Sequence, residues 1–232
     1  MTMLDVLKGI NIPDEMGIND DDSSDLSPNA AWFDGEVYYQ ARKAELPVHT
    51  DWGCSQFVII SGKDVYKLPF DGLWYPGYDE KDWETDEVIH HYDDSFENYA
   101  VNHCAKAVDV YQCAVVEGVD KIFAKMEIAG YSINKCAIYK QEYATTWLDE
   151  DKKASDESTS KAKEIESKQH VPFDSDWFAL AIDWYGFSFM QRVLDFIEEY
   201  EVDDLHRNNY GFAEDGRPIV YDYCSYDNSV VF

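Results

Sequence analysis

Three polar side chains near the end of the sequence have types and spacings suited to holding a metal ion and handling a proton. Asp204 is followed five positions later by Asn209, and Asp222 comes thirteen positions after Asn209. Carboxylate and amide oxygens are ligands that Mg²⁺ prefers, and a carboxylate also accepts a proton from a hydroxyl group. The intervening residues 216–221, Gly-Arg-Pro-Ile-Val-Tyr, predict a β-hairpin. We therefore expect one loop and one hairpin to bring the three groups to a single site.

Phosphoryl transfer from a nucleotide is the chemistry that such a set favours. This reaction needs little covalent chemistry from the protein and depends on holding phosphates and metal and on orienting the acceptor hydroxyl. Asp204 would accept or orient the proton, Asn209 and Asp222 would hold Mg²⁺, and Lys67 would hold the phosphates of ATP. Glu97 would orient Lys67. The competing interpretations are side-chain turns in a polar loop for Asp204 and Asn209, and a solvated strand end for Lys67.

The elements that must position these residues follow from hydrophobic periodicity. Residues 56–60 and 65–70 predict a hairpin with its turn at 61–64, which puts Lys67 on a strand. Residues 121–129 and 134–143 predict two more strands with Gly130 in the turn region. A long helix is expected after Ser95, and a strongly apolar one from Asp174 or Ser175 to Glu199, which leads directly to Asp203. A small sheet with a helix packed on it is the economical architecture.

Other segments predict less order. Residues 19–25 are too acidic and too small to pack, residues 29–45 have helical spacing, and residues 71–94 are expected to form a loop with a short helix at best. Residues 149–169 consist almost entirely of charged and small residues, which predicts a flexible insert or a solvated helix. The expected division is an acidic N-terminal extension (1–45), a first lobe (46–148), a flexible charged insert (149–172) and an abbreviated second lobe with the catalytic loop (173–232).

With these motifs, the sequence resembles the protein-kinase-like superfamily. The segment 204–209, Asp-Leu-His-Arg-Asn-Asn, has the D-L-H-x-x-N form of the catalytic loop found in the aminoglycoside-phosphotransferase branch and in short kinase-like proteins of bacteriophages. The resemblance implies an α+β, protein-kinase-like fold with a small antiparallel sheet and a helix in the first lobe and a truncated, mainly helical second lobe. It makes Asp204 the catalytic aspartate, Asn209 the metal-binding asparagine and Asp222 the first residue of a D-F-G-like triplet.

The register of the loop can be tested within the sequence. Asp203 and Asn208 are also five positions apart, but Asp222 then lies fourteen residues after the asparagine. The family has thirteen. We therefore choose Asp204 and Asn209.

The resemblance also assigns upstream residues. Lys67 ends the segment Val-Tyr-Lys that corresponds to the phosphate-holding strand, and Gly53 and Ser55 lie where the family has its glycine-rich loop, although only one glycine is present. Glu97 is the expected partner of Lys67, with Glu117 or Glu87 as the fallback. Glu142 and Tyr143 lie where the family's hinge presents backbone groups to adenine.

Two departures limit what the resemblance implies. Ten residues follow Asp222, where a protein kinase has an activation segment and a helical subdomain for its protein substrate. Asp203 takes the place of the arginine that precedes the catalytic aspartate and through which activation-loop phosphorylation acts. Regulation by that route is not expected, and substrate recognition must come from elsewhere in the chain or from a partner.

Composition constrains partners and location. The 47 acidic against 19 basic residues give a net charge of −28, which argues against direct binding to nucleic acid or anionic membrane and favours a basic partner. The five cysteines have no C-x-x-C spacing, and no apolar run approaches a membrane span of about 20 residues. A cytoplasmic protein is expected, in the host bacterial cytoplasm if it is a phage protein.

Two functions therefore compete. The first is a Mg-ATP-dependent phosphotransferase that acts on a protein or a small hydroxylated molecule. The second is a pseudokinase or an acidic decoy, resembling a nucleic-acid mimic, that binds and inhibits a basic host protein through its negative surface.

Overall fold

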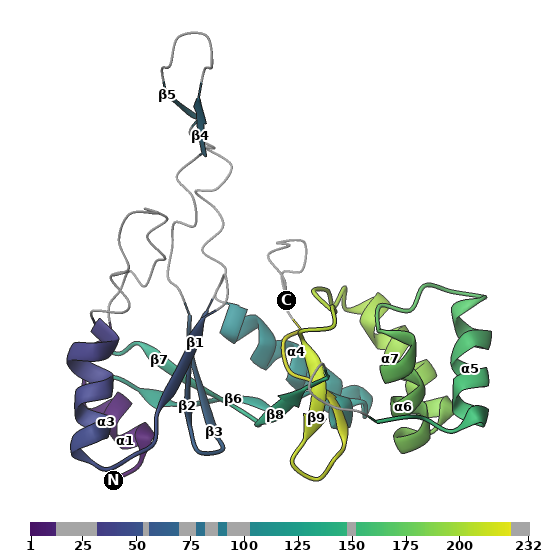
Figure 1. Ribbon diagram of the computed structural model, residues 1–232, viewed down its shortest axis with the longest axis horizontal. Helices are drawn as coiled ribbons and strands as arrows, with labels where there is room; N and C mark the ends of the chain where they lie inside the picture. Colours follow the sequence, from purple (N-terminus) through teal and green to yellow (C-terminus); the bar gives the residue numbers. More distant parts are fainter. Residues whose placement is uncertain are drawn as a thin grey trace.

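A five-stranded antiparallel sheet and a group of helices formed by the later part of the chain dominate the computed structural model (Figure 1). The structure describes residues 1–12, 32–52, 56–69, 78–81, 88–91, 103–147 and 152–223. Over these ranges the fold is α+β with a small antiparallel sheet and several helices, as the sequence predicts. None of the helices in these ranges is long and apolar enough to cross a membrane.

The large sheet has the strand order β1-β2-β3-β7-β6. Its strands are β1 (His49–Trp52), β2 (Gln56–Ser61), β3 (Asp64–Pro69), β6 (Met126–Tyr131) and β7 (Ala137–Gln141). The predicted β2–β3 hairpin is confirmed, and Gly62 has the positive φ, +64°, that its tight turn requires. The predicted second pair is also present, but Gly130 lies inside β6, and the connection to β7 follows it.

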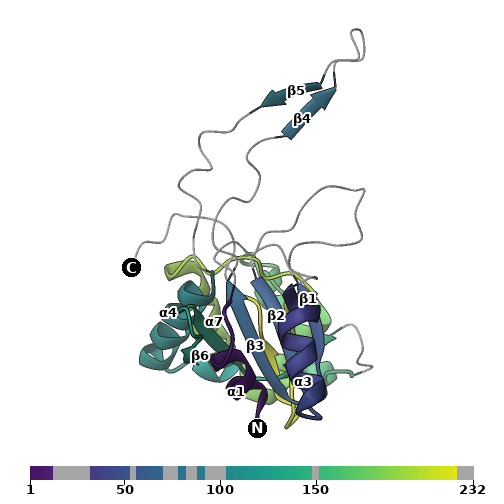
Figure 2. The same cartoon turned by 90° about the vertical axis from the view of Figure 1, so that its left-hand side faces the viewer.

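The two faces of this sheet have different coverings. One face carries Phe57, Ile59, Tyr66 and Leu68, which form a buried cluster with residues of α1 (Met3–Lys8), of the π-helical turn Phe33–Tyr38 and of α3 (Tyr39–Lys43). Figure 2 shows α1 and α3 lying against this side of the strands. Because side chains alternate along a strand, the residues between these point to the opposite face.

The opposite face packs against α4 (His103–Glu117), which is followed by a short 3₁₀ turn, Asp120–Ile122. Cys104 and Val108 of α4 form a buried cluster with Met126 and Tyr139 of the sheet. The predicted start of this helix at Ser95 lies outside the described residues. Three buried polar side chains also belong to this face, Gln56, Lys67 and Gln141.

The later helices are α5 (Asp156–Glu166), α6 (Ser175–Tyr185) and α7 (Phe187–Glu199). Asp174 caps α6 as predicted, since its carboxylate accepts hydrogen bonds from the backbone N–H groups of Asp176 and Trp177. The prediction of one continuous helix to Glu199 is wrong. Gly186 has φ +86° and separates α6 from α7. The apolar residues on both sides of Gly186 hide this break in the sequence.

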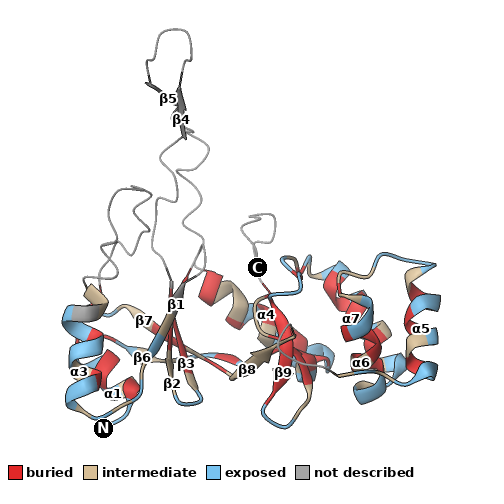
Figure 3. Cartoon of the chain, viewed as in Figure 1, coloured by how far each residue is buried: buried red, intermediate tan, exposed pale blue. Residues whose placement is uncertain are grey.

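The segment expected to be a flexible insert or a solvated helix contains α5. Ser155 caps this helix, and Ala162 and Ile165 are buried in the cluster that also contains α6 and α7. Figure 3 shows this inner face buried and the outer face exposed. The two apolar positions, together with hydrogen bonds from Ser155 and Ser158 to the Asp183 carboxylate of α6, attach this charged helix to its neighbours.

A second sheet of three strands has the order β10-β9-β8. It consists of β8 (Ala144–Thr146), β9 (Tyr210–Ala213) and β10 (Pro218–Val220), so the predicted hairpin at residues 216–221 is present as β9–β10. A separate pair, β4 (Tyr78–Lys81) and β5 (Val88–His91), lies within the segment expected to be a loop and stands apart from the large sheet (Figure 1).

Candidate active site

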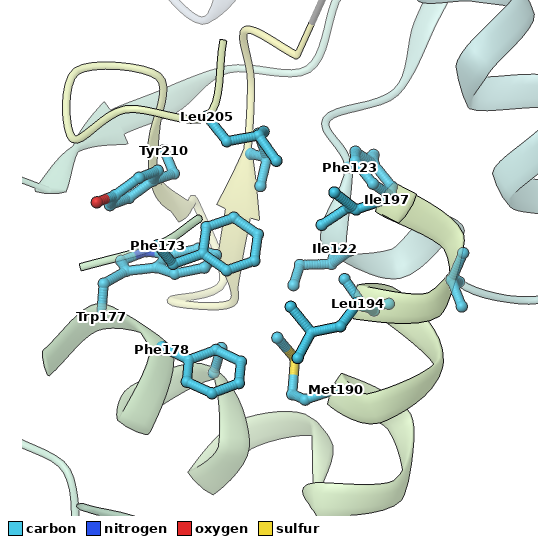
Figure 4. Close-up of a cluster of buried hydrophobic side chains, with 14 of the residues drawn as sticks. Ile122, Phe123, Phe173, Trp177, Phe178, Met190, Leu194, Ile197, Leu205 and Tyr210 are labelled. Atoms are coloured by element: carbon cyan, nitrogen blue, oxygen red, sulfur yellow. The ribbon is translucent and has the colours of Figure 1, made fainter. Parts of the chain in front are cut away.

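The loop between α7 and β9 is fixed by apolar side chains that point into the largest core cluster. Leu205 and Tyr210 lie at one end of this cluster, near Trp177 and Phe173 (Figure 4). Tyr223, directly after Asp222, is buried in the same cluster, and its hydroxyl donates to the carbonyl of Ala124 at 3.0 Å. The loop and the segment after β10 therefore have rigid supports on both sides.

Within this frame the three sequence-predicted loop residues come together. The side-chain amide of Asn209 donates to the backbone carbonyl of Asp204 at 2.7 Å. The backbone carbonyl of Asn209 accepts hydrogen bonds from the N–H groups of Tyr221 at 2.9 Å and of Asp222 at 3.2 Å. Asn209 is thus the link that connects Asp204 to Asp222, and this residue is only 7% exposed.

Asp204 has an unusual backbone and electrostatic setting. Its φ of +59° lies in the left-handed region, which aspartate tolerates better than most residues. Burial raises the pKa of the Asp204 carboxyl group, the charge of nearby Asp222 raises it further, and His206 opposes the rise. A raised pKa makes this carboxylate a better proton acceptor than an ordinary aspartate.

His206 supports the Asp204 carboxylate, in agreement with the expectation that this histidine caps or supports the loop. Its Nε2 lies 3.3 Å from Oδ1 of Asp204, and its Nδ1 accepts a hydrogen bond from the N–H of Asn208 at 3.3 Å. Because Nδ1 accepts, the neutral imidazole carries its proton on Nε2 and donates it toward Asp204. The position of His206 two residues after the aspartate was the only sequence signal for this contact.

Lys67 comes to this site from the large sheet. It lies on β3, is 5% exposed, and its Nζ is 3.7 Å from Oδ1 of Asp222. A lysine at a strand end is usually solvated, and this one is not. The structure therefore brings Lys67 together with Asp204, Asn209 and Asp222.

Two buried glutamines, which the sequence analysis did not select, also contact the segment 221–222. The Nε2 of Gln56 on β2 lies 3.1 Å from each carboxylate oxygen of Asp222. The Nε2 of Gln141, at the end of β7, donates to the backbone carbonyl of Tyr221. Three neighbouring strands thus each contribute one buried polar side chain, Gln56, Lys67 or Gln141, to the same two residues. In the sequence, a glutamine at the start of the apolar run of β2 is the only indication.

The expected hinge residues have contacts within the protein. The N–H of Glu142 donates to the carbonyl of Lys125 at 2.9 Å, and its carboxylate pairs with Arg217 of the β9–β10 turn. Tyr143 is partly buried. The side chain and the N–H group of Glu142 therefore connect it to neighbouring segments of the protein. The predicted hinge role needs only backbone groups that face the adenine of a nucleotide.

The remaining predicted residues are less informative. Gly53, Ser55, Glu97 and the fallback Glu87 lie outside the described residues. Glu117 is exposed at the end of α4, where its carbonyl accepts a hydrogen bond from Arg192 at 3.4 Å. In the described part of the chain, the carboxylate that pairs with Lys67 is Asp222.

The oxygen ligands at the site suit a divalent cation. Asn209 is buried, and its Oδ1 accepts no hydrogen bond from the described residues. Asp222 is held beside it, because the N–H of Asp222 donates to the backbone carbonyl of Asn209. One amide oxygen and one carboxylate suit Mg²⁺, which keeps several waters and takes few protein ligands. No group of three or more His, Cys, Asp or Glu side chains gathers as a metal site among the described residues.

Comparisons with known proteins place the chain in no family. No family model matches the chain, and a search of curated proteins gave no match. The function therefore has to be inferred from the residues themselves.

Proposed function

We propose that this chain is a kinase-like phosphotransferase that binds ATP with Mg²⁺. The observation that carries the proposal is the buried ammonium group of Lys67, 3.7 Å from Asp222, beside a loop that joins Asp222 to Asn209 and Asp204. Protein kinases hold phosphates with a lysine on their third strand, and metal with an aspartate and an asparagine that follow in the chain. Here Lys67 also lies on the third strand, and α4 packs across β3 and β6.

The nucleotide and its metal supply the phosphoryl group and the charge that stabilises its transfer. The chain's own residues have simpler tasks in this proposal. Asp204, with its raised pKa, accepts the proton of the acceptor hydroxyl, and His206 holds the carboxylate. Asn209 and Asp222 present oxygens to the cation, and Lys67 supplies a fixed positive charge for the phosphates.

The net charge of −28 is compatible with a bound nucleotide. At physiological salt the Debye length is about 8 Å, so exposed acidic groups far from the site are largely screened. The local cation Lys67 then decides the electrostatics of the site. The same charge favours a basic acceptor, such as a host protein if the chain comes from a bacteriophage.

Calorimetric titration with Mg-ATP tests the proposal before any acceptor is known. We expect saturable binding to the wild type and loss of that binding in Asp222→Asn. Transfer of label from ATP, with and without cell extract, should then be lost in Asp204→Ala although nucleotide binding remains. Label transfer that persists in Asp204→Ala would remove this mechanism.

A decoy that binds a basic protein is the second candidate, and a specific observation favours it. Gln56 and Lys67 both contact the Asp222 carboxylate, so side chains of the chain itself satisfy this group. The acidic composition would then provide the binding surface. A salt-sensitive complex that survives Asp222→Asn, together with no thermal shift by Mg-ATP, would support this candidate.

A further inference from the structure

Gln56 has the most unusual environment of the buried polar side chains at the site. It is 5% exposed, and its side chain lies on the same face of the sheet as Lys67, because Val58 pairs with Lys67 and residues 56 and 58 share a face. Its Nε2 lies 3.1 Å from both Asp222 oxygens, and its Oε1 accepts from Cys104 Sγ at 3.4 Å. The thiol on one side and the carboxylate on the other fix which way the amide points.

This arrangement conflicts with a metal-bound state. The carboxylate of Asp222 is the ionised ligand that the proposed function offers to Mg²⁺, and one amide group approaches both of its oxygens. An N–H donor and a cation compete for the same lone pairs. A cation that binds Asp222 therefore has to displace the amide from at least one oxygen.

Lys67 alone would not hold the carboxylate in this way. Its Nζ is 3.7 Å from Oδ1, beyond the usual length of a charge-assisted hydrogen bond, whereas Gln56 approaches both oxygens more closely. Gln56 is thus the group that orients Asp222, and Lys67 contributes a nearby positive charge.

We propose that Gln56 is a positioning residue that holds Asp222 in the cation-free protein and yields it when a divalent cation binds. The inference rests on the proposed function, since it needs a cation at Asp222. It adds that Gln56 of β2 and the cation compete for the Asp222 carboxylate. Cation binding at Asp222 therefore changes the contact between β2 and the segment 221–222.

The test uses the full chain and Mn²⁺ alone as the probe, with free Mn²⁺ measured by electron paramagnetic resonance. Mn²⁺ binding that disappears in Asp222→Asn is assigned to the proposed site. This criterion separates it from weak Mn²⁺ binding to the acidic surface. Gln56→Leu should bind Mn²⁺ at this site about tenfold to a hundredfold more tightly than the wild type, because a competing hydrogen bond to a charged group is removed. The metal-free variant should also melt at a lower temperature.

Two further variants keep the test decisive. Gln56→Asn retains the amide on a side chain that is one methylene shorter, so it serves if the leucine variant does not fold and should also tighten Mn²⁺ binding. Gln141→Leu removes the other buried glutamine, whose partner is the Tyr221 carbonyl and not the carboxylate. It should lower the melting temperature and change Mn²⁺ affinity much less than Gln56→Leu does.

The outcomes separate the two ideas. Affinity in the Gln56 variants that equals or falls below that of the wild type overturns the competition and leaves the proposed function standing. A wild-type protein with no Asp222-dependent Mn²⁺ binding overturns both. Binding that tightens as much in Gln141→Leu as in Gln56→Leu also overturns the specific role of Gln56, because any loosening of the segment 221–222 would then have the same effect.

Discussion

Lys67 Nζ lies 3.7 Å from Asp222 Oδ1, yet the two side chains differ in exposure, at 6% for the lysine and 35% for the aspartate. The pair connects the large sheet to the segment after β10. Its asymmetry has a consequence for stability. Removal of the lysine leaves a carboxylate that water still reaches, whereas removal of the negative charge leaves a buried ammonium group without its partner.

We therefore expect Asp222→Asn to destabilise the protein more than Lys67→Met. An unpaired buried charge costs about 3–5 kcal/mol in a fully buried pair. Partial exposure of Asp222 reduces this to about 2–3 kcal/mol for Asp222→Asn and about 1–2 kcal/mol for Lys67→Met. Urea unfolding at neutral pH measures both values. A larger loss of stability in Lys67→Met than in Asp222→Asn would show that the carboxylate, and not the lysine, is the group that is more costly to bury without its partner.

Asp204→Asn should stabilise the protein at neutral pH although it removes transfer activity. The pKa of Asp204 is raised in the folded state above its ordinary value of 3.8, so ionisation is less favourable in the fold than in the unfolded chain. The stability that protonated Asp204 contributes is fully present below the ordinary value and is lost as pH rises through the raised one. Asparagine avoids this loss and also tolerates the left-handed backbone at this position.

The measurement for Asp204→Asn is the difference in melting temperature from the wild type as a function of pH. The difference should be positive near pH 7 and shrink as the pH approaches 3.8, the ordinary pKa of the carboxyl group. A variant that is less stable than the wild type at neutral pH would show that the hydrogen bonds of Asp204 outweigh its burial. His206→Gln, which removes the opposing imidazole, provides the comparison, since its effect should not reproduce this pH dependence.

Gly211→Ala should disrupt the sheet that carries Asn209. A Cβ atom at Gly211 would lie 1.8 Å from the backbone carbonyl oxygen of Thr145, and β8 cannot move away without losing its pairing with β9. Overpacking commonly costs 1–3 kcal/mol and occasionally more, so we expect a loss of about 3 kcal/mol or more, measured by thermal or urea unfolding.

Gly216 provides the matched control for this prediction. It lies in the turn of the same hairpin with φ +85°, and a Cβ atom there would meet nothing within 4 Å. Gly216→Ala should therefore cost only the backbone strain, about 1–2 kcal/mol. Equal losses in the two variants would mean that β8 adjusts to a side chain at position 211.

The sequence predicted the elements whose signals are local. The alternation in residues 56–70 gives β2, β3 and the place of Lys67 on a strand, and the spacing of Asp204, Asn209 and Asp222 anticipates their connection through the β9–β10 hairpin. Turn glycines such as Gly62 and Gly216 mark the hairpins in the sequence, because these tight turns need a positive φ, which glycine adopts at no steric cost.

Features that depend on distant parts of the chain were not predictable in this way. The break at Gly186 is hidden because apolar residues continue on both sides, and a glycine in a helical pattern is often tolerated. The pairing of β8 with β9 and the contacts of Gln56 and Gln141 join segments far apart in the sequence. The periodicity of side chains along a strand does not reveal which buried polar group a glutamine will contact.

Variants of Glu142 and Arg217 distinguish a structural role for Glu142 from a role in nucleotide binding. Its carboxylate pairs with Arg217, and the two side chains are 32% and 18% exposed, so the pair is partly shielded from solvent. Glu142→Gln should lose about 1 kcal/mol of stability, and Arg217→Gln a similar amount or more, since the same guanidinium also donates to the Lys121 carbonyl.

The double variant should lose less than the sum of the two single losses, because the interaction can be removed only once. If Glu142 contributes to a nucleotide site only through its backbone, Mg-ATP affinity in Glu142→Gln should stay within about twofold of the wild type, a change of less than 1 kcal/mol. Additive losses would deny the coupling. A tenfold loss of affinity with little change in stability would instead make the carboxylate a direct contact of the nucleotide.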